Sequence, residues 1–364
     1  MSYKYHKILY CTVYHSMETG HLHDYFFENS EHFYEYIYAP IFKNRPAILR
    51  YYHNRLLISE NQVMFYKGNN KLLIYFFTLV QYIFFVFKFS IRNTFTIVYE
   101  PILFIGSRIQ SLFLNNHSVI WLWDYFPNDT VLIHLLNIMT NFYVKHAKFS
   151  LFLTDNIRNE YSHLYANQQI WKTIGLGMDN QNIKHATIVD QFGFIGNLKR
   201  GQGLELVFDF IKNDPVRKLD VVGNGAFKED LIKIVKKLDI ENQVNFLGYQ
   251  SESELKTICS RWQIAFATYD LTVKNNVYYA DPSKIKLYLE LGVPVIMTKV
   301  TYFESYLQKF NAGICISYSL HELSEAVRII QDKYMNYQYG VKKLVKVFDY
   351  KILYEKGFSF MEHE

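Results

Sequence analysis

Short apolar runs recur at regular intervals along the second half of the chain and predict β-strands. They lie at 192–196, 219–223, 244–248, 264–268, 293–297 and 312–317. Charged segments with helical spacing, such as 227–238 and 253–260, separate most of these runs. Strands that are apolar on both faces and alternate with helices are typical of a parallel sheet covered by helices. Because the crossovers of such sheets are right-handed, we predict a doubly wound α/β domain.

The first half of the chain is less regular but favours a second Rossmann-like domain. Its candidate strands lie at 7–13, 95–99, 118–123 and 149–153. A polar, glycine-containing stretch without helical period at 173–190 predicts the boundary between the two halves. We therefore expect a first domain over 1–175, a second over 176–335 and a helical tail over 336–364.

The segment 72–87 is apolar throughout and carries no charge. Three interpretations remain open for it. It forms a buried or half-buried crossover helix of the first domain, a helix that rests on a membrane surface, or a membrane span. A span usually needs about 20 apolar residues, and this run is shorter.

Composition limits the class of protein and its partners. The 364 residues, half of them apolar, suffice for two cores. A net charge of +5 suits an anionic ligand or an acidic membrane surface and is too weak to indicate nucleic acid. Cys11, Cys259 and Cys315 lack metal-ligand spacing and are expected to be buried thiols in a reducing compartment. With no signal-peptide cleavage site at the N-terminus, we expect a cytoplasmic protein.

The segment 280–297, ADPSKIKLYLELGVPVIM, is the strongest candidate for chemistry. Asp281 is expected to cap a helix that has Pro282 in its first position. Ser283 and Lys284 would then offer backbone N–H groups and a charge at the positive end of that helix. This combination suits a phosphate group. The alternative is a well-capped structural helix with a solvated lysine.

Two glycine-containing turns after predicted strands are further candidates. In GFIGNLKRGQGL at 193–204, glycines surround Lys199 and Arg200, which would neutralise a diphosphate. In VVGNG at 221–225, the glycines lie where a ligand crevice often borders a parallel sheet. Neither turn has the spacing of a dinucleotide-binding motif, and both are also explained as surface turns.

The first half offers a carboxylate and a histidine-containing loop. Asp124 follows an apolar strand among aromatic residues. It is either a base or a group that orients a sugar hydroxyl, or else a helix cap or a satisfied buried polar group. The loop after the first strand contains Gly20 with His15, His21 and His23. These side chains are near enough in sequence to meet a ligand, but they complete no known metal-ligand spacing.

In this order, the motifs GFIGNLKRGQG, LDVVGNG, VNFLGY, DPSKIKLYLELGVPVI and AGICI resemble glycosyltransferase family 4 and its GT-B relatives. The stretch IGLGMD is similar to the entry into the second domain of such chains. The resemblance spans about 173–330, nearly half of the chain. It implies two Rossmann-like domains that face a central cleft, with a C-terminal helix that packs back on the first domain.

The resemblance also implies roles for individual residues. Asp124 would face the reacting sugar as the catalytic residue. The residues that would bind the donor are Gly20, Gly196, Asn197, Lys199, Arg200, Gly223, Gly225, Tyr249, Ser283, Lys284 and Leu287. The donor would be a nucleoside-diphosphate sugar, with UDP favoured, and neither a metal nor another cofactor would be required. The acceptor would be a glycan, glycolipid or glycoprotein, with membrane contact through the first domain.

Three positions depart from the pattern of the family, and one of them is Asn197, where an arginine often follows the first glycine of the strand-end motif. Retaining members commonly carry two glutamates eight positions apart, and here these positions hold Tyr279 and Leu287. The chain is in this respect similar to certain bacterial transferases of surface glycans. The departure leaves the stereochemistry open, and the sequence does not indicate the oligomeric state. It also leaves two alternatives to a transferase, which are a non-catalytic partner or glycan-binding homologue and a nucleotide-sugar epimerase.

Overall fold

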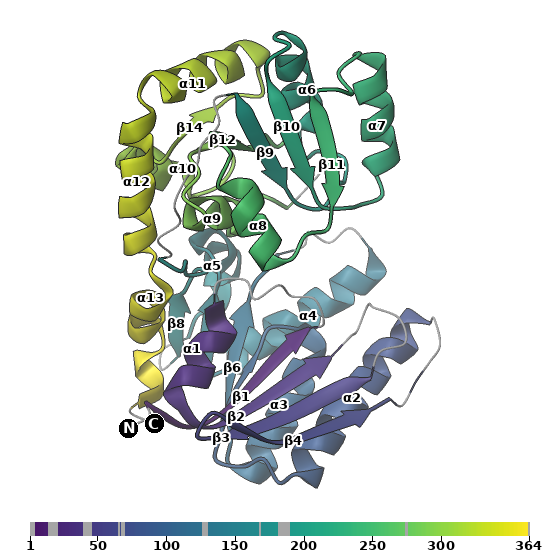
Figure 1. The fold of residues 1–364 in the computed structure, drawn as a ribbon. Coiled ribbons are helices and arrows are strands. Elements are labelled where there is room, and N and C mark those ends of the chain that lie inside the picture. Colours follow the sequence, from purple (N-terminus) through teal and green to yellow (C-terminus); the bar gives the residue numbers. More distant parts are fainter. Residues whose placement is uncertain are drawn as a thin grey trace. The chain divides into compact units, whose positions relative to one another are not determined.

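The computed structural model divides the chain into two compact units. It describes residues 4–13, 21–38, 46–64, 66, 70–125, 130–166, 169–180, 190–273 and 276–362. The first unit comprises 1–177 together with 350–364, and the second comprises 178–349 (Figure 1). The second unit therefore extends beyond the expected end at 335, because α12 (Tyr334–Val347) buries Val341 and Leu344 in its core.

The first unit contains an eight-stranded sheet in the order β4-β3-β2-β1-β5-β6-β7-β8. β3 pairs antiparallel with β2 on one side and with β4 on the other. All other neighbouring strands of this sheet are parallel. The four predicted strands are confirmed as β1, β5, β6 and β7. The bounds are β1 (Tyr5–Val13), β2 (Ser30–Tyr38), β3 (Ala47–His53), β4 (Leu56–Val63), β5 (Phe95–Val98), β6 (His117–Leu122), β7 (Phe149–Phe152) and β8 (Ile170–Thr173).

Helices connect these strands, and the C-terminal segment joins the same unit. The described helices of the first unit are α1 (Leu22–Asn29), α2 (Lys71–Lys88), α3 (Pro101–Leu114), α4 (Val131–His146), α5 (Asp155–Tyr161), η2 (Ser162–Leu164), α13 (Tyr350–Gly357) and η3 (Ser359–Glu362). The rings of Tyr354 and Phe358 pack against Tyr25, and Phe358 also contacts Trp121. The C-terminal helix therefore packs on the first unit, as expected.

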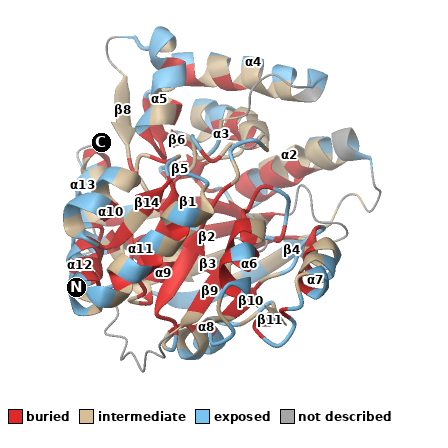
Figure 2. Ribbon diagram, turned by 90° about the horizontal axis from the view of Figure 1, so that it is seen from above, coloured by how far each residue is buried: buried red, intermediate tan, exposed pale blue. Residues whose placement is uncertain are grey.

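The apolar segment 72–87 lies in α2, which is half-buried. Tyr82, Phe85 and Val86 are fully buried, whereas Phe76 and Phe87 are exposed (Figure 2). Among the helices that the structure describes, none combines the length and the apolar character needed to cross a bilayer. These observations support the half-buried helix among the three interpretations.

The second unit is a six-stranded parallel sheet in the order β11-β10-β9-β12-β13-β14. All six predicted strands are confirmed, as β9 (Gln191–Ile195), β10 (Lys218–Val222), β11 (Val244–Gly248), β12 (Ile264–Ala267), β13 (Val295–Thr298) and β14 (Gly313–Ile316). The other helices are α6 (Leu204–Lys212), α7 (Lys228–Lys237), α8 (Glu252–Cys259), α9 (Ser283–Glu290), α10 (Glu304–Phe310) and α11 (Leu320–Asp332). Clusters of buried apolar side chains lie on both sides of this sheet.

A buried carboxylate joins three strands of this sheet. Asp220 accepts hydrogen bonds from Trp262 Nε1 at 2.9 Å, Gln191 Nε2 at 3.0 Å and Asn245 Nδ2 at 3.0 Å. The Trp262 ring lies over Gly193, where an added Cβ would come within 2.0 Å of it. Glycine at this position of β9 therefore makes room for the indole ring.

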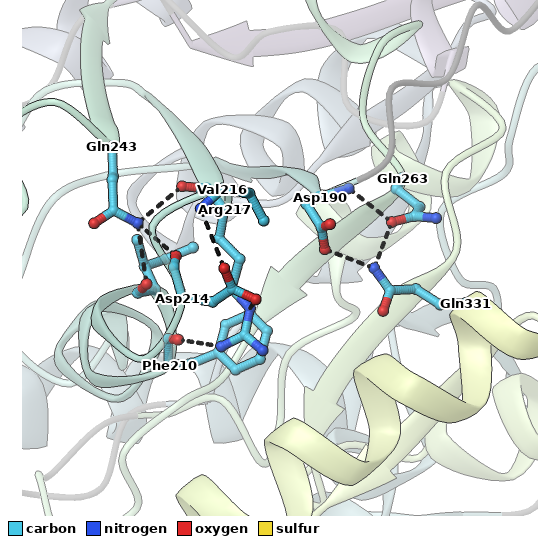
Figure 3. Close-up of polar contacts among 9 residues, drawn as sticks. Asp190, Phe210, Asp214, Val216, Arg217, Gln243, Gln263 and Gln331 are labelled. Atoms are coloured by element: carbon cyan, nitrogen blue, oxygen red, sulfur yellow. Dashed lines mark hydrogen bonds and ion pairs between the residues drawn. The ribbon is translucent and has the colours of Figure 1, made fainter.

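Side-chain amides close the amino-terminal edge of the same sheet (Figure 3). Gln243 Nε2 lies within 3.1 Å of the carbonyl oxygens of Ile211, Asp214 and Arg217, which fixes the turn between α6 and β10. Gln331 donates to Asp190 at 2.9 Å and to Gln263 at 2.8 Å. These bonds occupy polar groups that would otherwise be buried without partners.

Candidate functional site

The order of strands in the second unit defines where a ligand would lie. The chain passes from β9 to β10 on one side and later returns to β12 on the other side of β9. The strand order thus reverses at β9, and the loops after β9 and β12 lie at the carboxyl edge of the sheet at this point. Ligands of open α/β sheets bind at such switch points.

Backbone contacts hold the turns at this edge against one another. Thr268 Oγ1, just after β12, donates to the Gly203 carbonyl at 2.9 Å. A Cβ at Gly203 would come within 1.4 Å of the Thr268 carbonyl oxygen, and the φ of +74° also favours glycine. Gly223 lies against Gly196, since a Cβ at 223 would be 2.0 Å from the Gly196 oxygen. The glycines therefore bring three strand ends into direct backbone contact.

Lys284 places its ammonium group at this switch point. It lies in the first turn of α9, half-buried, with its Nζ 4.5 Å from the centroid of the Phe194 ring and 4.7 Å from that of Tyr269. The ammonium group donates to the side-chain oxygen of Gln202 and lies 3.3 Å from the position of a Cβ on Gly196. Among the described residues, no carboxylate forms an ion pair with it.

This environment lowers the pKa of Lys284 to about 7. Burial is the main cause, because it disfavours the charged form, and the nearby charge of Lys199 adds to it. An anion bound beside Gly196 would supply the missing negative charge and raise the pKa again. The site is therefore suited to a phosphate group that arrives with its own charge.

The prediction that Asp281 caps this helix is wrong, because its carboxylate is engaged by two other side chains. Its carboxylate binds Lys286 Nζ at 2.6 Å and accepts a hydrogen bond from the Tyr302 hydroxyl at 3.0 Å. Both side chains of the ion pair are almost completely buried. The helix begins at Ser283, with Pro282 as its N-terminal cap residue and no side-chain cap.

Ser283 differs from the sequence prediction in the same way. Its N–H donates to the Asp281 carbonyl at 2.8 Å, so this N–H is already used within the turn, whereas it was expected to be available to a phosphate. The Ser283 side chain is exposed. The positive charge of Lys284 therefore carries more of the candidate anion site than the backbone of the helix start does.

The two basic residues of the loop after β9 point to different neighbours. Arg200 lies over the Phe227 ring at 4.8 Å, and its Nη2 is 3.9 Å from Asp230 on α7. Lys199 instead contributes to the electrostatic environment of Lys284. Both side chains are exposed, as is Asn197. In this arrangement Lys199 acts on the same position as Lys284, while Arg200 is engaged with α7.

The remaining predicted donor residues lie at the same edge or on α9. Gly225 packs against the Leu198 carbonyl, and Tyr249 is exposed directly after β11. Leu287 is half-buried and packs on the core below the switch point. Tyr288, which was not predicted, lies beneath it and accepts a hydrogen bond from the Ile195 N–H at 2.7 Å. Phe194, Gln202 and Tyr269 were also missed by sequence reasoning.

The first unit carries two carboxylates at the carboxyl edge of its own sheet. Asp124 is exposed after β6, and Glu100 is half-buried after β5, the neighbouring strand. The Tyr99 and Trp123 rings that precede them are stacked at 4.8 Å. Burial, together with the charge of Asp124, raises the pKa of Glu100 to about 7. The sequence analysis did not identify Glu100, because a glutamate before Pro101 gives no functional signal by itself.

The histidine-containing loop is only partly visible in the structure. Gly20 and His15 lie outside the described residues. His21 and His23 both approach Asp24, at 3.6 and 3.4 Å, and the two imidazoles lower the pKa of that carboxyl. Both histidines therefore have Asp24 as a partner within the protein.

Comparison with known folds and families agrees with this geometry. Residues 180–339 match the family model described as "Glycosyl transferases group 1". No curated protein matches the sequence. Sucrose-phosphate synthase from Thermosynechococcus elongatus has a TM-score of 0.71 at 10% identity, over 98% of this chain and 99% of the other. HepE from Anabaena, in complex with UDP, has a TM-score of 0.68 at 11% identity, over 98% and 100%.

A third similar structure is the pneumococcal O-GlcNAc transferase GtfA in complex with UDP and GlcNAc. Its TM-score is 0.59 at 14% identity, over 87% of this chain and 64% of the other. At these identities the likeness shows the fold, which is that of GT-B glycosyltransferases. Together with this fold, the match of residues 180–339 to glycosyl transferases group 1 supports a glycosyltransferase. Membership of family 4 in particular stays a prediction.

We expect UDP binding to depend on Lys284 and on pH. The Lys284→Met variant should bind UDP about 10- to 150-fold more weakly, because it loses a charged hydrogen-bond donor worth about 1.5–3 kcal/mol. In the wild type, the affinity should fall as the pH rises above about 7, where the free lysine loses its proton. Isothermal titration calorimetry between pH 6.5 and 8.5 measures both effects.

Lys218→Met is a matched control for this experiment. Lys218 lies at the opposite edge of the same sheet, where its Nζ donates to the Asn242 carbonyl at 2.9 Å. This variant should keep the affinity and the pH dependence of the wild type. Equal affinities for UDP in the wild type and in Lys284→Met would show that the nucleotide binds elsewhere.

Glu100→Gln should change how stability depends on pH. The folded wild type holds a proton on Glu100 up to about pH 7, whereas the unfolded chain releases it near its ordinary pKa of 4.5. The wild type therefore loses stability between these values, and the glutamine variant does not. Relative to wild type, the variant should gain about 1–3 kcal/mol between pH 5 and pH 8 in urea unfolding. Glu28→Gln, at an exposed position, should show no such gain.

Proposed function

We propose that the chain transfers a sugar from a UDP-sugar to a hydroxyl group of a glycan, glycolipid or glycoprotein. The observation that carries this proposal is the half-buried ammonium group of Lys284 beside Gly196, which lacks a carboxylate partner among the described residues. A diphosphate at this switch point would complete the charge balance. UDP is favoured because HepE and GtfA, whose fold the chain shares, were solved with it.

In the proposed reaction, the bond between the anomeric carbon and the β-phosphate oxygen breaks. A bond forms between that carbon and the acceptor oxygen, and UDP leaves with the electron pair. Lys284 and Lys199 would stabilise the charge that develops on the leaving phosphate. In this proposal these cations take the place of a metal ion.

The proton of the acceptor hydroxyl would pass to the carboxylate pair of the first unit. Asp124 is exposed, and its charge contributes to the raised pKa of Glu100, so it is the proposed base. The stacked Tyr99 and Trp123 rings beside the pair would provide an apolar face for the acceptor. Trp123 Nε1 and the Tyr38 hydroxyl are buried without hydrogen-bond partners in the described structure, which leaves two polar groups for this ligand.

The decisive experiment measures binding and donor hydrolysis separately. We expect UDP-glucose or UDP-N-acetylglucosamine to bind, and slow release of UDP without acceptor. A ligand at 100 times its Kd should add about 2.7 kcal/mol of stability. Asp124→Asn should keep donor affinity but lose at least tenfold in turnover, whereas Lys284→Met should lose affinity. If neither UDP, GDP nor their sugars bind, the non-catalytic alternative replaces this proposal.

We further propose that the acceptor is reached at a membrane surface, to which the first unit binds peripherally on the cytoplasmic side. Along α4, Val131, Leu135, Ile138 and Phe142 recur at helical spacing, and each is more than half exposed. Leu112 and Phe113 are exposed on the adjacent α3. Contiguous apolar surface of this kind is typical of interaction sites.

The charge of these helices favours anionic lipid over a protein partner. α2, α3 and α4 contain no aspartate or glutamate, but they carry Lys71, Lys88, Arg108 and Lys145. A pocket of about 270 Å³ between α3 and α4 is lined by Arg108, His146 and Lys148 together with aromatic rings. An anionic headgroup fits this basic rim, while acyl chains would contact the apolar stripe.

Vesicle sedimentation tests this surface. The wild type should sediment with vesicles that contain phosphatidylglycerol, and more weakly with phosphatidylcholine alone or at high salt. Leu135→Glu and Phe142→Glu should reduce binding at least tenfold. Met335→Glu, at an exposed apolar position of the second unit, is the control and should bind as the wild type does. Unchanged vesicle binding by the α4 variants would contradict this proposal. A loss of vesicle binding that is explained by a change in dimerisation would contradict it as well.

A further inference from the structure

Three histidines from three strands surround one carboxylate in the first unit. His6 lies near the start of β1, Glu31 and His32 near the start of β2, and His53 at the end of β3. The register pairs His32 directly with His53 across the antiparallel strands. The cluster therefore lies at the amino edge of the parallel strands, whereas Asp124 follows the carboxyl end of one of them.

The ring nitrogens of these histidines point to the same carboxylate. His6 Nδ1 lies 2.8 Å from Glu31 Oε2. His53 Nε2 and His32 Nε2 lie 3.9 and 4.0 Å from Glu31 Oε1. The His32 ring is 5.1 Å from that of His6 and 4.6 Å from that of His53, between centroids.

A neighbouring tyrosine orients the central histidine. The Tyr51 hydroxyl is hydrogen-bonded to His32 Nδ1 at 2.8 Å, so this ring turns its Nε2 to the cluster. Histidines that bind metals usually have their second nitrogen held in this way. The arrangement thus includes an outer partner as well as the ligand atoms themselves.

The spacing and the chemistry both fit a transition metal. Ligand atoms around a tetrahedral zinc ion, bound at 2.0–2.1 Å, lie about 3.3 Å apart. One ligand atom from each of His6, Glu31 and His32 lies within 4.8 Å of the other two, so these atoms converge on one point. Imidazole nitrogens favour zinc, copper or nickel, whereas calcium and magnesium prefer oxygen ligands.

We propose that His6, Glu31, His32 and His53 form a site for a zinc-like divalent cation. The ion would join β1, β2 and β3 at the edge of the sheet remote from Asp124, so its role is structural. Without the ion, the hydrogen bond between His6 Nδ1 and Glu31 Oε2 would hold part of the cluster together. The two states differ in metal content, which can be measured directly.

Zinc titration of the full chain tests the site, using protein without a histidine tag that has been dialysed against EDTA. Calorimetry at pH 7.5 should give about one zinc ion per chain, and magnesium and calcium should give no heat. His6→Ala and His53→Ala change exposed side chains, so both variants should fold. Each should bind zinc at least tenfold more weakly.

His163→Ala removes an exposed histidine elsewhere in the first unit and should bind zinc as the wild type does. Zinc should also raise the Tm of the wild type and of this control, but not that of the His6→Ala/His53→Ala double variant. If the wild type binds no zinc, or the double variant keeps the wild-type affinity and Tm shift, the proposal is wrong.

Discussion

The candidate anion site of the second unit depends on an ammonium group that the protein holds away from bulk water without a carboxylate partner among the described residues. Lys284 lies between the rings of Phe194 and Tyr269, and Gln202 accepts its hydrogen bond. Aromatic faces and an amide oxygen offset part of the cost of burying the charge, but less than a carboxylate would. The lowered pKa of Lys284 is the consequence. A diphosphate thus gains an interaction that no group of the free protein already satisfies.

A second lysine on α9, two positions after Lys284, is buried together with a carboxylate partner. Lys286 is fully buried but is paired with Asp281, which also binds Tyr302. Removing one partner of such a pair would leave an uncompensated buried charge, at a cost of about 3–5 kcal/mol. The pair therefore fixes the turn that precedes α9. Because Lys284 lies in the first turn of this helix, the buried pair also fixes where its ammonium group can lie.

The sequence predicts the second unit well because its strands are buried on both faces. Most of the six strands there are short, mainly apolar runs with helices or turns between them, although β10 contains Asp220 and β11 contains Asn245. In the first unit, β4 reads LLISENQV and is largely exposed, so it lacks the apolar signal by which the other strands are recognised. The hairpin that it forms with β3 was missed for that reason.

In the candidate site too, features set by neighbouring residues can be predicted from the sequence, whereas contacts between distant residues cannot. Lys284 can be found from its position after Asp281 and Pro282, but its contacts with Phe194 and Gln202 join residues more than 80 positions apart. The role of Asp281 was misjudged because its partner Tyr302 lies beyond the next strand. Glu100 could have been found, since it and Asp124 both follow apolar strands whose carboxyl ends meet at one edge.

The distribution of charge between the two units has a chemical reason. Glu100 and Asp124 belong to the first unit, whereas Lys199 and Lys284 belong to the second. A carboxylate close to Lys284 would neutralise it and would repel a diphosphate, so a base and an anion site on one sheet edge would weaken each other. In the first unit, burial and the charge of Asp124 raise the pKa of Glu100 to about 7. In the second unit, burial and the charge of Lys199 lower the pKa of Lys284 to about 7. Each shift thus has the same two causes, which are burial and a like charge from the same unit.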